Sequence, residues 1–385
     1  MTVDAIRRGS GEGSAVGHGS GEESTVAERL AVAVSSGEIP GAVFVTGGPG
    51  LPEQFVIAGD ARVHGGPRRP MHRDTLFDLA SLTKVVATLP AVLRLAERGG
   101  LALDNRVARF LPQFTGEGRD EVTVRHLLAH TSGLAAEIRF WSRCHDPQQA
   151  EAVLRTAPLE HPPGTRTVYS DVGFMLLGRI VTAVTGAPLD TAVAELVTRP
   201  LGMTLTQFSP GPAQADQAAS TELQPDGTAI TGVVHDENAR FFGGVSGHAG
   251  LFAPAGDLAR YLTSAWLGDG LLAAATRRVA CRIQTEGTGG RRGLGWVLRG
   301  DQQDSLGSRW PATSITHTGF TGTSLACDPA SGHWAVLLTN EVHYGRNRGI
   351  IRHVREDVHD RCAPPLPDPP GEARHRGVPG GRPPG

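Results

Sequence analysis

The sequence predicts an α+β fold, in which helices from the N- and C-terminal ends of the chain flank an antiparallel sheet that carries an inserted helical subdomain. A helical pattern at residues 26–34 precedes two strand-like runs at residues 41–46 and 55–58. Helical patterns then dominate from about residue 85 to residue 262, and strand-like runs return only near the end of the chain. Strands that are remote in sequence therefore have to pair around the helical insertion.

The individual elements follow from periodicity and from the residues that interrupt it. Apolar side chains recur at helical spacing from residue 81 to residue 96, and Gly99 and Gly100 end this helix. Pro90 is expected to kink it because proline removes one backbone hydrogen bond. Further helices are expected at residues 124–129, 148–155, 172–184, 189–197, 255–262 and 347–359. Extended segments are expected at residues 294–298, 314–326 and 334–339.

The composition is that of a soluble globular protein with one large domain. The formal net charge of −2 gives no reason to expect nucleic acid or an anionic membrane as a partner. We expect a folded domain over residues 25–362, with its helical subdomain at about 85–262. Two disordered tails should flank it, a Gly/Ser-rich one at residues 1–24 and a Pro/Gly-rich one at residues 363–385. Residues 1–24 lack the apolar stretch of a signal peptide, which predicts a cytoplasmic protein.

The chain contains a single lysine, Lys84, among 37 Lys and Arg residues. A guanidinium stays protonated at any working pH, whereas a buried amine can shift its pKa and exchange protons. Lys84 follows Ser81 by three residues, which places both side chains on one face of a helix that begins near Ser81. A neutral amine there could take the serine proton during nucleophilic attack. The alternative is an N-cap serine beside a solvated lysine.

Tyr169 and Asp171 form a second candidate group, which follows a Pro-Pro-Gly turn and opens an expected helix. A phenol held near an ammonium can act as an acid or a base. The alternative for Tyr169 is a hydrogen-bonded core tyrosine, and Asp171 is equally a candidate N-cap of the helix.

A third candidate group is His317, Thr318 and Gly319, in an expected strand that continues to a second glycine, Gly322. A glycine in a strand lets a substrate approach the backbone closely. An exposed N–H on this strand, together with the N–H of Ser81, would form an oxyanion hole.

Three ordered motifs resemble those of the serine β-lactamase and penicillin-binding-protein superfamily, namely Ser81-x-x-Lys84, Tyr169-Ser-Asp171 and His317-Thr-Gly319. The likeness is greatest to the class C-like branch, which includes family VIII-type carboxylesterases and penicillin-binding-protein-like serine hydrolases. It covers roughly residues 25–360, and further matching stretches lie at residues 125–134, 169–178, 234–239 and 247–252. The resemblance implies a β-lactamase/DD-peptidase-like fold and does not specify a substrate.

The resemblance also implies catalytic roles. Ser81 would be the acylated nucleophile, and Lys84 and Tyr169 would share the proton transfers of acylation and deacylation. The backbone N–H groups of Ser81 and Phe320 would form the oxyanion hole.

Asp171, His317, Thr318 and Gly319 are implied to bind the substrate, and two of them depart from the family pattern. Asp171 stands where the family usually has Asn, and a carboxylate near Lys84 would favour the ammonium and leave the tyrosine as the better base. Alternatively, Asp171 caps its helix and points away. His317 replaces the lysine of Lys-Thr-Gly, and a largely neutral imidazole weakens recognition of a substrate carboxylate, which favours esters.

The remaining histidines and the cysteines are given no catalytic role. His126 and His130 have the i, i+4 spacing of zinc ligands on a helix, but the glutamate of the His-Glu-x-x-His motif is absent. Packing and hydrogen bonding are therefore favoured over a metal, and neither a metal nor a cofactor is expected. His235, Asp236 and His248 are expected to shape the cleft. The four cysteines lack metal-ligand spacing and are interpreted as reduced thiols.

The leading hypothesis is a serine hydrolase that cleaves a carboxylic ester, or transfers its acyl group, through an acyl-enzyme on Ser81. Its partner would be a small-molecule ester or amide substrate, with no nucleic acid and no membrane. One alternative is a β-lactamase or D-amino-acid peptidase, against which the expected cytoplasmic location counts. Another is a non-catalytic scaffold that retains the fold, against which the presence of all three motifs counts.

Overall fold

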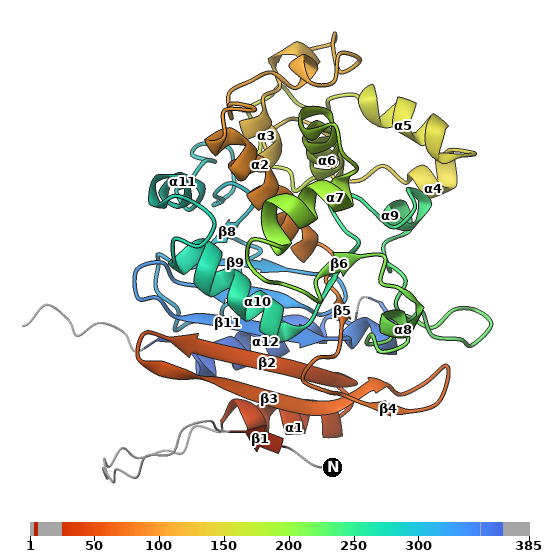
Figure 1. Cartoon of the computed structure of the whole chain (residues 1–385), viewed down its shortest axis with the longest axis vertical. Helices are drawn as coiled ribbons and strands as arrows, with labels where there is room; N and C mark the ends of the chain where they lie inside the picture. The colour runs from red at the N-terminus through yellow and green to blue at the C-terminus, as the bar shows by residue number, and fades with distance from the viewer. Residues whose placement is uncertain (1–3, 7–24, 347, 365–385) are drawn as a thin grey trace, which may run out of the picture.

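An antiparallel sheet of eight strands forms the base of the molecule in the computed structural model, which describes residues 4–6, 25–346 and 348–364 (Figure 1). The strand order is β1-β3-β2-β11-β10-β9-β8, and β4 pairs with β3 outside this path. The strands are β1 (Asp4–Ile6), β2 (Gly41–Gly48), β3 (Leu51–Arg62), β4 (Arg69–Pro70), β8 (Val297–Leu298), β9 (Ile315–Thr318), β10 (Ser324–Cys327) and β11 (Trp334–Thr339). Because β2 pairs with β11, the two ends of the chain meet inside the sheet, which confirms the predicted α+β fold.

Helices cover both faces of this sheet, and the side chains of the central strands alternate between two apolar cores. Ala42 and Phe44 of β2 pack with α1 (Val26–Ser35) and α12 (Ile350–Arg361). Val43 and Val45, which point the other way, belong to the larger core that also includes α10 (Ala255–Tyr261). A strand with apolar residues on both faces can be buried only in this layered arrangement.

The helical part lies at the far end of the molecule from β2 and β3, with α6 (Asp171–Thr185) in its core (Figure 1). A three-stranded sheet, ordered β5-β7-β6, joins this part to the larger sheet region. Its strands are β5 (Phe77–Asp78), β6 (Gln207–Phe208) and β7 (Leu251–Ala253). The other helices are α2 (Leu89–Glu97), α3 (Val124–Leu128), α4 (Phe140–Arg143), α5 (Pro147–Arg155), α7 (Leu189–Val193), α8 (Pro212–Ala215), α9 (Glu237–Phe241) and α11 (Ala274–Ala280).

Three segments have π-helical geometry and three are short 3₁₀ turns. The π-helical segments are η1 (Lys84–Thr88), η4 (Ala194–Thr198) and η5 (Leu262–Leu267), and the 3₁₀ turns are η2 (Val107–Arg109), η3 (Arg119–Glu121) and η6 (Glu341–Tyr344). Among the described helices, none is by itself long and apolar enough to cross a membrane. Residues Asp171–Thr185 and Leu189–Thr198 meet that criterion only as a pair bent by 79°.

The segment expected to be one helix over residues 81–96 is divided in the structure. A π-helical turn, η1, precedes α2, and the N–H of Leu89 donates to the carbonyl of Lys84, five residues earlier. Pro90 lies in the first turn of α2, where its missing N–H leaves no hydrogen bond unmade. The helical hydrogen-bond register therefore changes just before the proline, at the place where the sequence predicted an interruption.

The prediction of a single extended segment at residues 314–326 is also wrong, because these residues form two strands, β9 and β10, that pair antiparallel. The turn between them contains Gly322 at φ +113, a conformation that residues with a side chain rarely adopt. The Gly319 N–H donates to Thr323 O at 2.8 Å and closes the turn.

The chain ends fall only partly within the described residues. In the segment expected to be an N-terminal tail, Asp4–Ile6 pair with β3 as β1, and residues 7–24 lie outside the described part. The C-terminal tail expected from residue 363 lies outside it from residue 365 onward. The last expected helix is α12, which begins at Ile350, after Gly349 in the left-handed conformation.

Candidate active site

Ser81 lies on a strained turn between β5 and the helical segment that contains η1. The preceding residue, Ala80, has φ +45, a left-handed conformation that costs energy for a residue with a side chain. The turn is held because the Ala80 N–H donates to Asp78 Oδ1 at 2.9 Å and the Leu79 N–H donates to Leu251 O at 2.9 Å. Ser81 is thereby placed at the N-terminal, electropositive end of the following helix.

Lys84 lies beneath Ser81 and is fully buried. Its Nζ donates to Ser81 Oγ at 2.9 Å and to the carbonyl of His248 at 3.3 Å. An ion pair of 2.7 Å joins the same Nζ to Asp171 Oδ1. The side-chain amine of the only lysine therefore contacts both a serine hydroxyl and a carboxylate, and it does not point into solvent.

Two opposing effects set the protonation of Lys84. Burial by itself would lower the pKa of Lys84, because the charged form is poorly solvated in the core. The Asp171 carboxylate and a hydrogen bond to Tyr169 oppose burial and outweigh it, so the pKa of Lys84 is raised. Lys84 is consequently an ammonium at neutral pH, a form that cannot accept the Ser81 proton.

Asp171 is not the N-cap of α6. Ser170 has that role, since its Oγ accepts the Gly173 N–H at 3.1 Å, and Asp171 is the first residue of the helix. The Asp171 carboxylate is thus free to contact Lys84, which resolves the two alternatives in favour of the ion pair. Sequence alone left them open because serine and aspartate are both good N-cap residues.

Aromatic and cationic groups surround Tyr169. Lys84 Nζ lies 4.8 Å from the centre of the Tyr169 ring, and Arg292 Cζ lies 5.3 Å from it. The ring of His130 packs at 4.7 Å between centres. His130 also fixes the backbone beside Tyr169, because its Nδ1 accepts the Ser170 N–H at 3.0 Å. Packing and hydrogen bonding, as favoured from the sequence, therefore describe the contacts of His130.

A cavity of about 360 Å³ opens above these groups and brings together Ser81, Tyr169 and four consecutive residues of the β9 strand and turn, His317, Thr318, Gly319 and Phe320. His317 is buried, and its Nδ1 lies 2.9 Å from Thr318 O. Burial lowers the pKa of His317 well below its usual value, and the nearby Lys84 and Arg292 lower it further. The side chain at this position is therefore neutral at pH 7, in agreement with the expectation that it supplies no cation.

Gly319 lets the backbone of this turn approach the nucleophile turn closely. A Cβ atom at Gly319 would lie 2.2 Å from Thr323 Oγ1 and 2.4 Å from Leu79 O, so no side chain fits there. Thr323 Oγ1 donates to Leu79 O at 3.2 Å, and Thr321 Oγ1 donates to Asp78 O at 2.7 Å. These bonds tie the turn after β9 to the backbone that precedes Ser81.

The backbone N–H groups of Ser81 and Phe320 are free of hydrogen bonds to any part of the chain that the structure describes. Both residues line the same cavity. Two unpaired N–H donors at one cavity are what an oxyanion hole requires. The Phe320 side chain is half exposed and stacks on His235 at 5.6 Å between ring centres.

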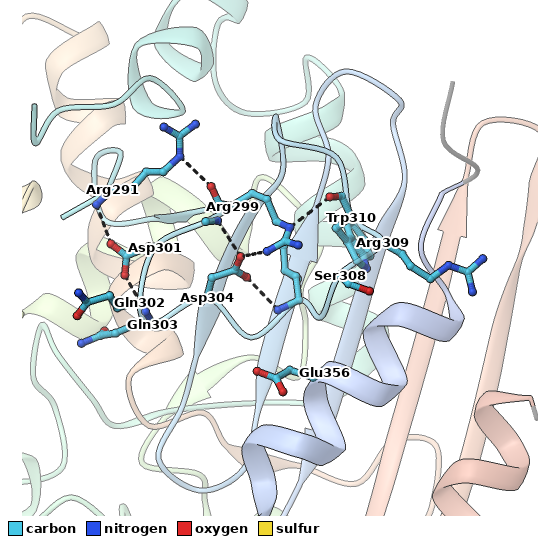
Figure 2. A network of polar contacts seen from close by, with 12 residues as sticks. Arg291, Arg299, Asp301, Gln302, Gln303, Asp304, Ser308, Arg309, Trp310 and Glu356 are labelled. Carbon is cyan, nitrogen blue, oxygen red and sulfur yellow. Dashed lines mark hydrogen bonds and ion pairs between the residues drawn. The ribbon is translucent and has the colours of Figure 1, made fainter. Parts of the chain in front are cut away.

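Arg292 is a site residue that the sequence did not reveal, because nothing in the pattern distinguishes it from the other arginines. It is 2% exposed and bonds to Gln303, which also lines the cavity. Figure 2 shows the loop that carries Gln303: Asp301 accepts the Arg291 N–H at 2.7 Å, and Asp304 pairs with Arg299. Arg292 thus places a permanent cation beside Tyr169, although its pKa is lowered by burial.

The buried His248 pairs with the partly exposed Asp236 next to the lysine. His248 Nε2 lies 2.9 Å from Asp236 Oδ1, and its Nδ1 lies 2.8 Å from Ser246 Oγ. Burial would raise the pKa of Asp236, but His248 and the Ala239 N–H outweigh it and the pKa is lowered. The pair holds the carbonyl of His248 against Lys84. Among the described residues, no three His, Cys, Asp or Glu side chains converge as metal ligands would.

Comparisons with known proteins agree with this geometry. The profile of the family described as Beta-lactamase matches residues 23–359. A protein of Escherichia coli (strain K12) named "Putative D-alanyl-D-alanine carboxypeptidase" is 36% identical over 304 residues, which are 70% of either chain. The "N-acetylmuramyl-L-alanine amidase" of Bacillus subtilis (strain 168) is 33% identical over 347 residues, 79% of this chain and 78% of that one.

Solved structures show the same fold. EstCE1, described as a hydrolase with promiscuous acyltransferase activity, has a TM-score of 0.69 and 26% identity, over 87% of this chain and 97% of that one. A class C β-lactamase from Rhodobacter sphaeroides has a TM-score of 0.68 and 21% identity, over 86% of this chain and 97% of that one. With the family profile spanning almost all of the folded residues, this chain belongs to the β-lactamase family of serine hydrolases.

Proposed function

We propose that this serine hydrolase cleaves carboxylic esters, or transfers their acyl group, through a covalent acyl-enzyme on Ser81. The observation that carries the proposal is the contact of Ser81 Oγ with the fully buried Lys84 ammonium at 2.9 Å. A hydroxyl that contacts a buried cation at a helix N-terminus is activated, because its alkoxide form is stabilised where attack occurs.

The ion pair with Asp171 assigns the proton transfers. Since Lys84 is held as an ammonium, we give the proton transfers to Tyr169: the Ser81 proton passes to the Tyr169 oxygen, and the phenol proton passes to the leaving oxygen of the ester. The carbonyl oxygen becomes an oxyanion that accepts from the N–H groups of Ser81 and Phe320. The C–O bond of the ester then breaks, and the alcohol leaves with the proton from Tyr169. Water, or a second alcohol in acyl transfer, repeats these steps on the acyl-enzyme.

The absence of a positive charge on His317 supports the choice of esters as substrates. A neutral imidazole gives a substrate carboxylate no ionic partner at this position, and simple esters carry no carboxylate. The similarity to EstCE1, a hydrolase with promiscuous acyltransferase activity, supports a hydrolase that can also transfer an acyl group.

The test is labelling by a fluorophosphonate probe and hydrolysis of a p-nitrophenyl ester of a short acid. Ser81→Ala should abolish both, and intact-mass analysis of the wild-type protein should show one added acyl group. Ser142→Ala is the matched control, because Ser142 is exposed and bonds only to Arg139 O. Labelling of Ser81→Ala at the wild-type rate would show that another residue is the nucleophile.

A D-amino-acid peptidase or β-lactamase is the second candidate, favoured by the arginines of the cavity wall. Arg346, Arg348 and Arg355 line the same cavity as Ser81. Burial lowers the pKa of Arg355 to about 10, against the opposing charge of Glu341, so it remains a cation at pH 7. These cations could bind the carboxylate that His317 does not. Nitrocefin turnover, or a covalent penicillin adduct seen by intact mass without ester turnover, would establish this candidate instead.

A further inference from the structure

A second cavity, of about 580 Å³, lies outside the active site, beside the edge strand β8 and the helix α11 (Figure 1). Neighbouring residues of β8 separate the two cavities, because Val297 lines the first and Leu298 lines the second. Its volume lies in the range of roughly 300–1,000 Å³ that holds small molecules. None of the residues given a role in the chemistry at Ser81 lines it.

All the charged side chains that line the second cavity are positive. Four arginines line it, Arg277, Arg278, Arg282 and Arg291, and its lining includes no Asp or Glu. Arg277 is already engaged, since it pairs with Asp269 at 2.7 Å. Arg278 and Arg282 are exposed, and their side chains make no hydrogen bond or ion pair with any residue that the structure describes. Two guanidinium groups at the mouth are therefore available to an anion.

Arg291 is held in place as a third rim cation. Its Nε donates to Arg299 O at 2.8 Å and its backbone N–H donates to Asp301, which leaves the outer guanidinium nitrogens without a described partner (Figure 2). The same loop is braced by Asp304, whose Oδ2 accepts the Gly300 N–H at 2.8 Å. The loop that carries Arg291 is thus held in place at the opening of the cavity.

The interior of the second cavity is mostly apolar and includes two hydroxyl side chains, Thr313 and Ser314. Apolar side chains line it, namely Trp266, Leu267, Ala274, Ile283, Leu298, Ala312, Pro329 and Ala330. Cys281 adds a thiol whose pKa is raised to about 12 by burial, so it behaves as a small neutral group. Ser314 also lines the cavity, is fully buried, and its Oγ has no hydrogen-bond partner among the described residues. The charged side chains of the lining are therefore the arginines alone.

We propose that this cavity is a binding site for a small amphiphilic carboxylate, an organic acid with one apolar chain. The apolar chain would lie against Trp266 and Leu298, and the carboxylate would bind the guanidinium groups of Arg278 and Arg282. An apolar lining with a cationic rim and no acidic side chain matches both halves of such a molecule. The site is independent of the chemistry at Ser81, so its test does not require the proposed function to hold.

The experiment is calorimetric titration of the full chain with sodium octanoate, with 1-octanol as the uncharged probe. One saturable octanoate site is expected, and binding should weaken as the salt concentration rises. Arg278→Gln and Arg282→Gln should each weaken binding about tenfold, the value of one charge-assisted hydrogen bond. Ala274→Trp, at an exposed position of the lining, should obstruct the cavity and abolish binding.

Arg98→Gln is the matched control, because Arg98 is exposed and its side chain also lacks a described partner. It should bind octanoate as the wild type does, and all the arginine variants should keep the wild-type Tm. Octanoate affinity that is unchanged in the double variant of Arg278 and Arg282 would overturn the proposal. So would equal affinity for octanol, or binding that is lost in Phe320→Ala and not in the double variant, which would place the ligand at Ser81.

Discussion

The ion pair between Lys84 and Asp171 makes Asp171→Asn the most informative perturbation of this protein. The substitution keeps the shape of the side chain and removes the charge 2.7 Å from a lysine that is fully buried. Without the carboxylate, only the contributions of Tyr169 oppose burial, so we expect the pKa of Lys84 to fall. The variant therefore replaces a permanent ammonium with an amine that can lose its proton.

The cost in stability follows from burial. Breaking a buried ion pair by removing one partner costs about 3–5 kcal/mol. The Asp171 side chain is 25% exposed, and asparagine can still accept a hydrogen bond, so we expect about 1–3 kcal/mol at pH 7. In the wild type the pKa of Lys84 is raised above its usual 10.5, so its contribution is complete below that pH and is lost above it. In the variant, the buried ammonium of Lys84 destabilises the fold at low pH. The difference in the free energy of unfolding between the variant and the wild type therefore narrows as the pH rises toward 10.5.

Urea denaturation at about pH 7 and about pH 9.5 measures this difference. The rate of ester hydrolysis should add a second readout, because kcat/KM of the variant should fall as the pH rises and Lys84 loses the charge that stabilises the Ser81 alkoxide, and the wild type should lack that titration below pH 10.5. Asp74→Asn is the control, since Asp74 is exposed and has no described side-chain partner. Equal stability of Asp171→Asn and the wild type at both pH values, with identical pH–rate profiles, would refute the reasoning.

Three further predictions concern other parts of the site. Tyr169→Phe should lower kcat by about 10²–10⁴ with Tm unchanged, because it removes the proton acceptor and leaves the ring packing; an unchanged kcat in steady-state assays would reassign the base. Gly319→Ala should lower both Tm and kcat, because the new Cβ would meet Leu79 O at 2.4 Å; a fully active, equally stable variant would contradict the close approach. Stability should fall as the pH drops below 6.5, since burial lowers the pKa of His130, His317 and His359 and the unfolded chain then binds more protons. His317→Gln should reduce that slope in urea denaturation at about pH 5 and pH 7, and an unaltered slope would remove His317 from the explanation.

Local chemistry accounts for the parts of the site that were predictable. Spacing along a helix is set by its pitch, so the i, i+3 spacing of Ser81 and Lys84 was enough to place both on one face. Lys84 could be singled out because it is the only lysine in the sequence. Gly319 and Gly322 could be singled out because they interrupt a strand-like run of residues. The prediction of one continuous strand through these two glycines was wrong, because they lie in the turn between β9 and β10. A glycine-containing strand and a turn have the same sequence pattern, and only the pairing of the strands distinguishes them.

Arg292 was not predictable as a neighbour of the reaction, and the sequence, which placed Asp236 and His248 at the cleft, did not predict that they pair with each other. Each comes from a segment more than a hundred residues from Ser81, and no local pattern connects them. The same holds for the second cavity, whose arginines belong to α11 and the loop before β8 while Ser314 precedes β9. Contacts of this kind form only when segments that are distant in the sequence pack together.

The sequence by itself determined the α+β class, the order of the elements and the candidate reacting side chains, because periodicity and short motifs are properties of neighbouring residues. Only the tertiary structure decided the charge state of Lys84. That state depends on whether Ser170 or Asp171 caps α6, and on how deeply the lysine is buried between η1, α6 and the carbonyl of His248. Electrostatic free energies depend on distance and solvation, and neither is encoded in the spacing of residues along the chain.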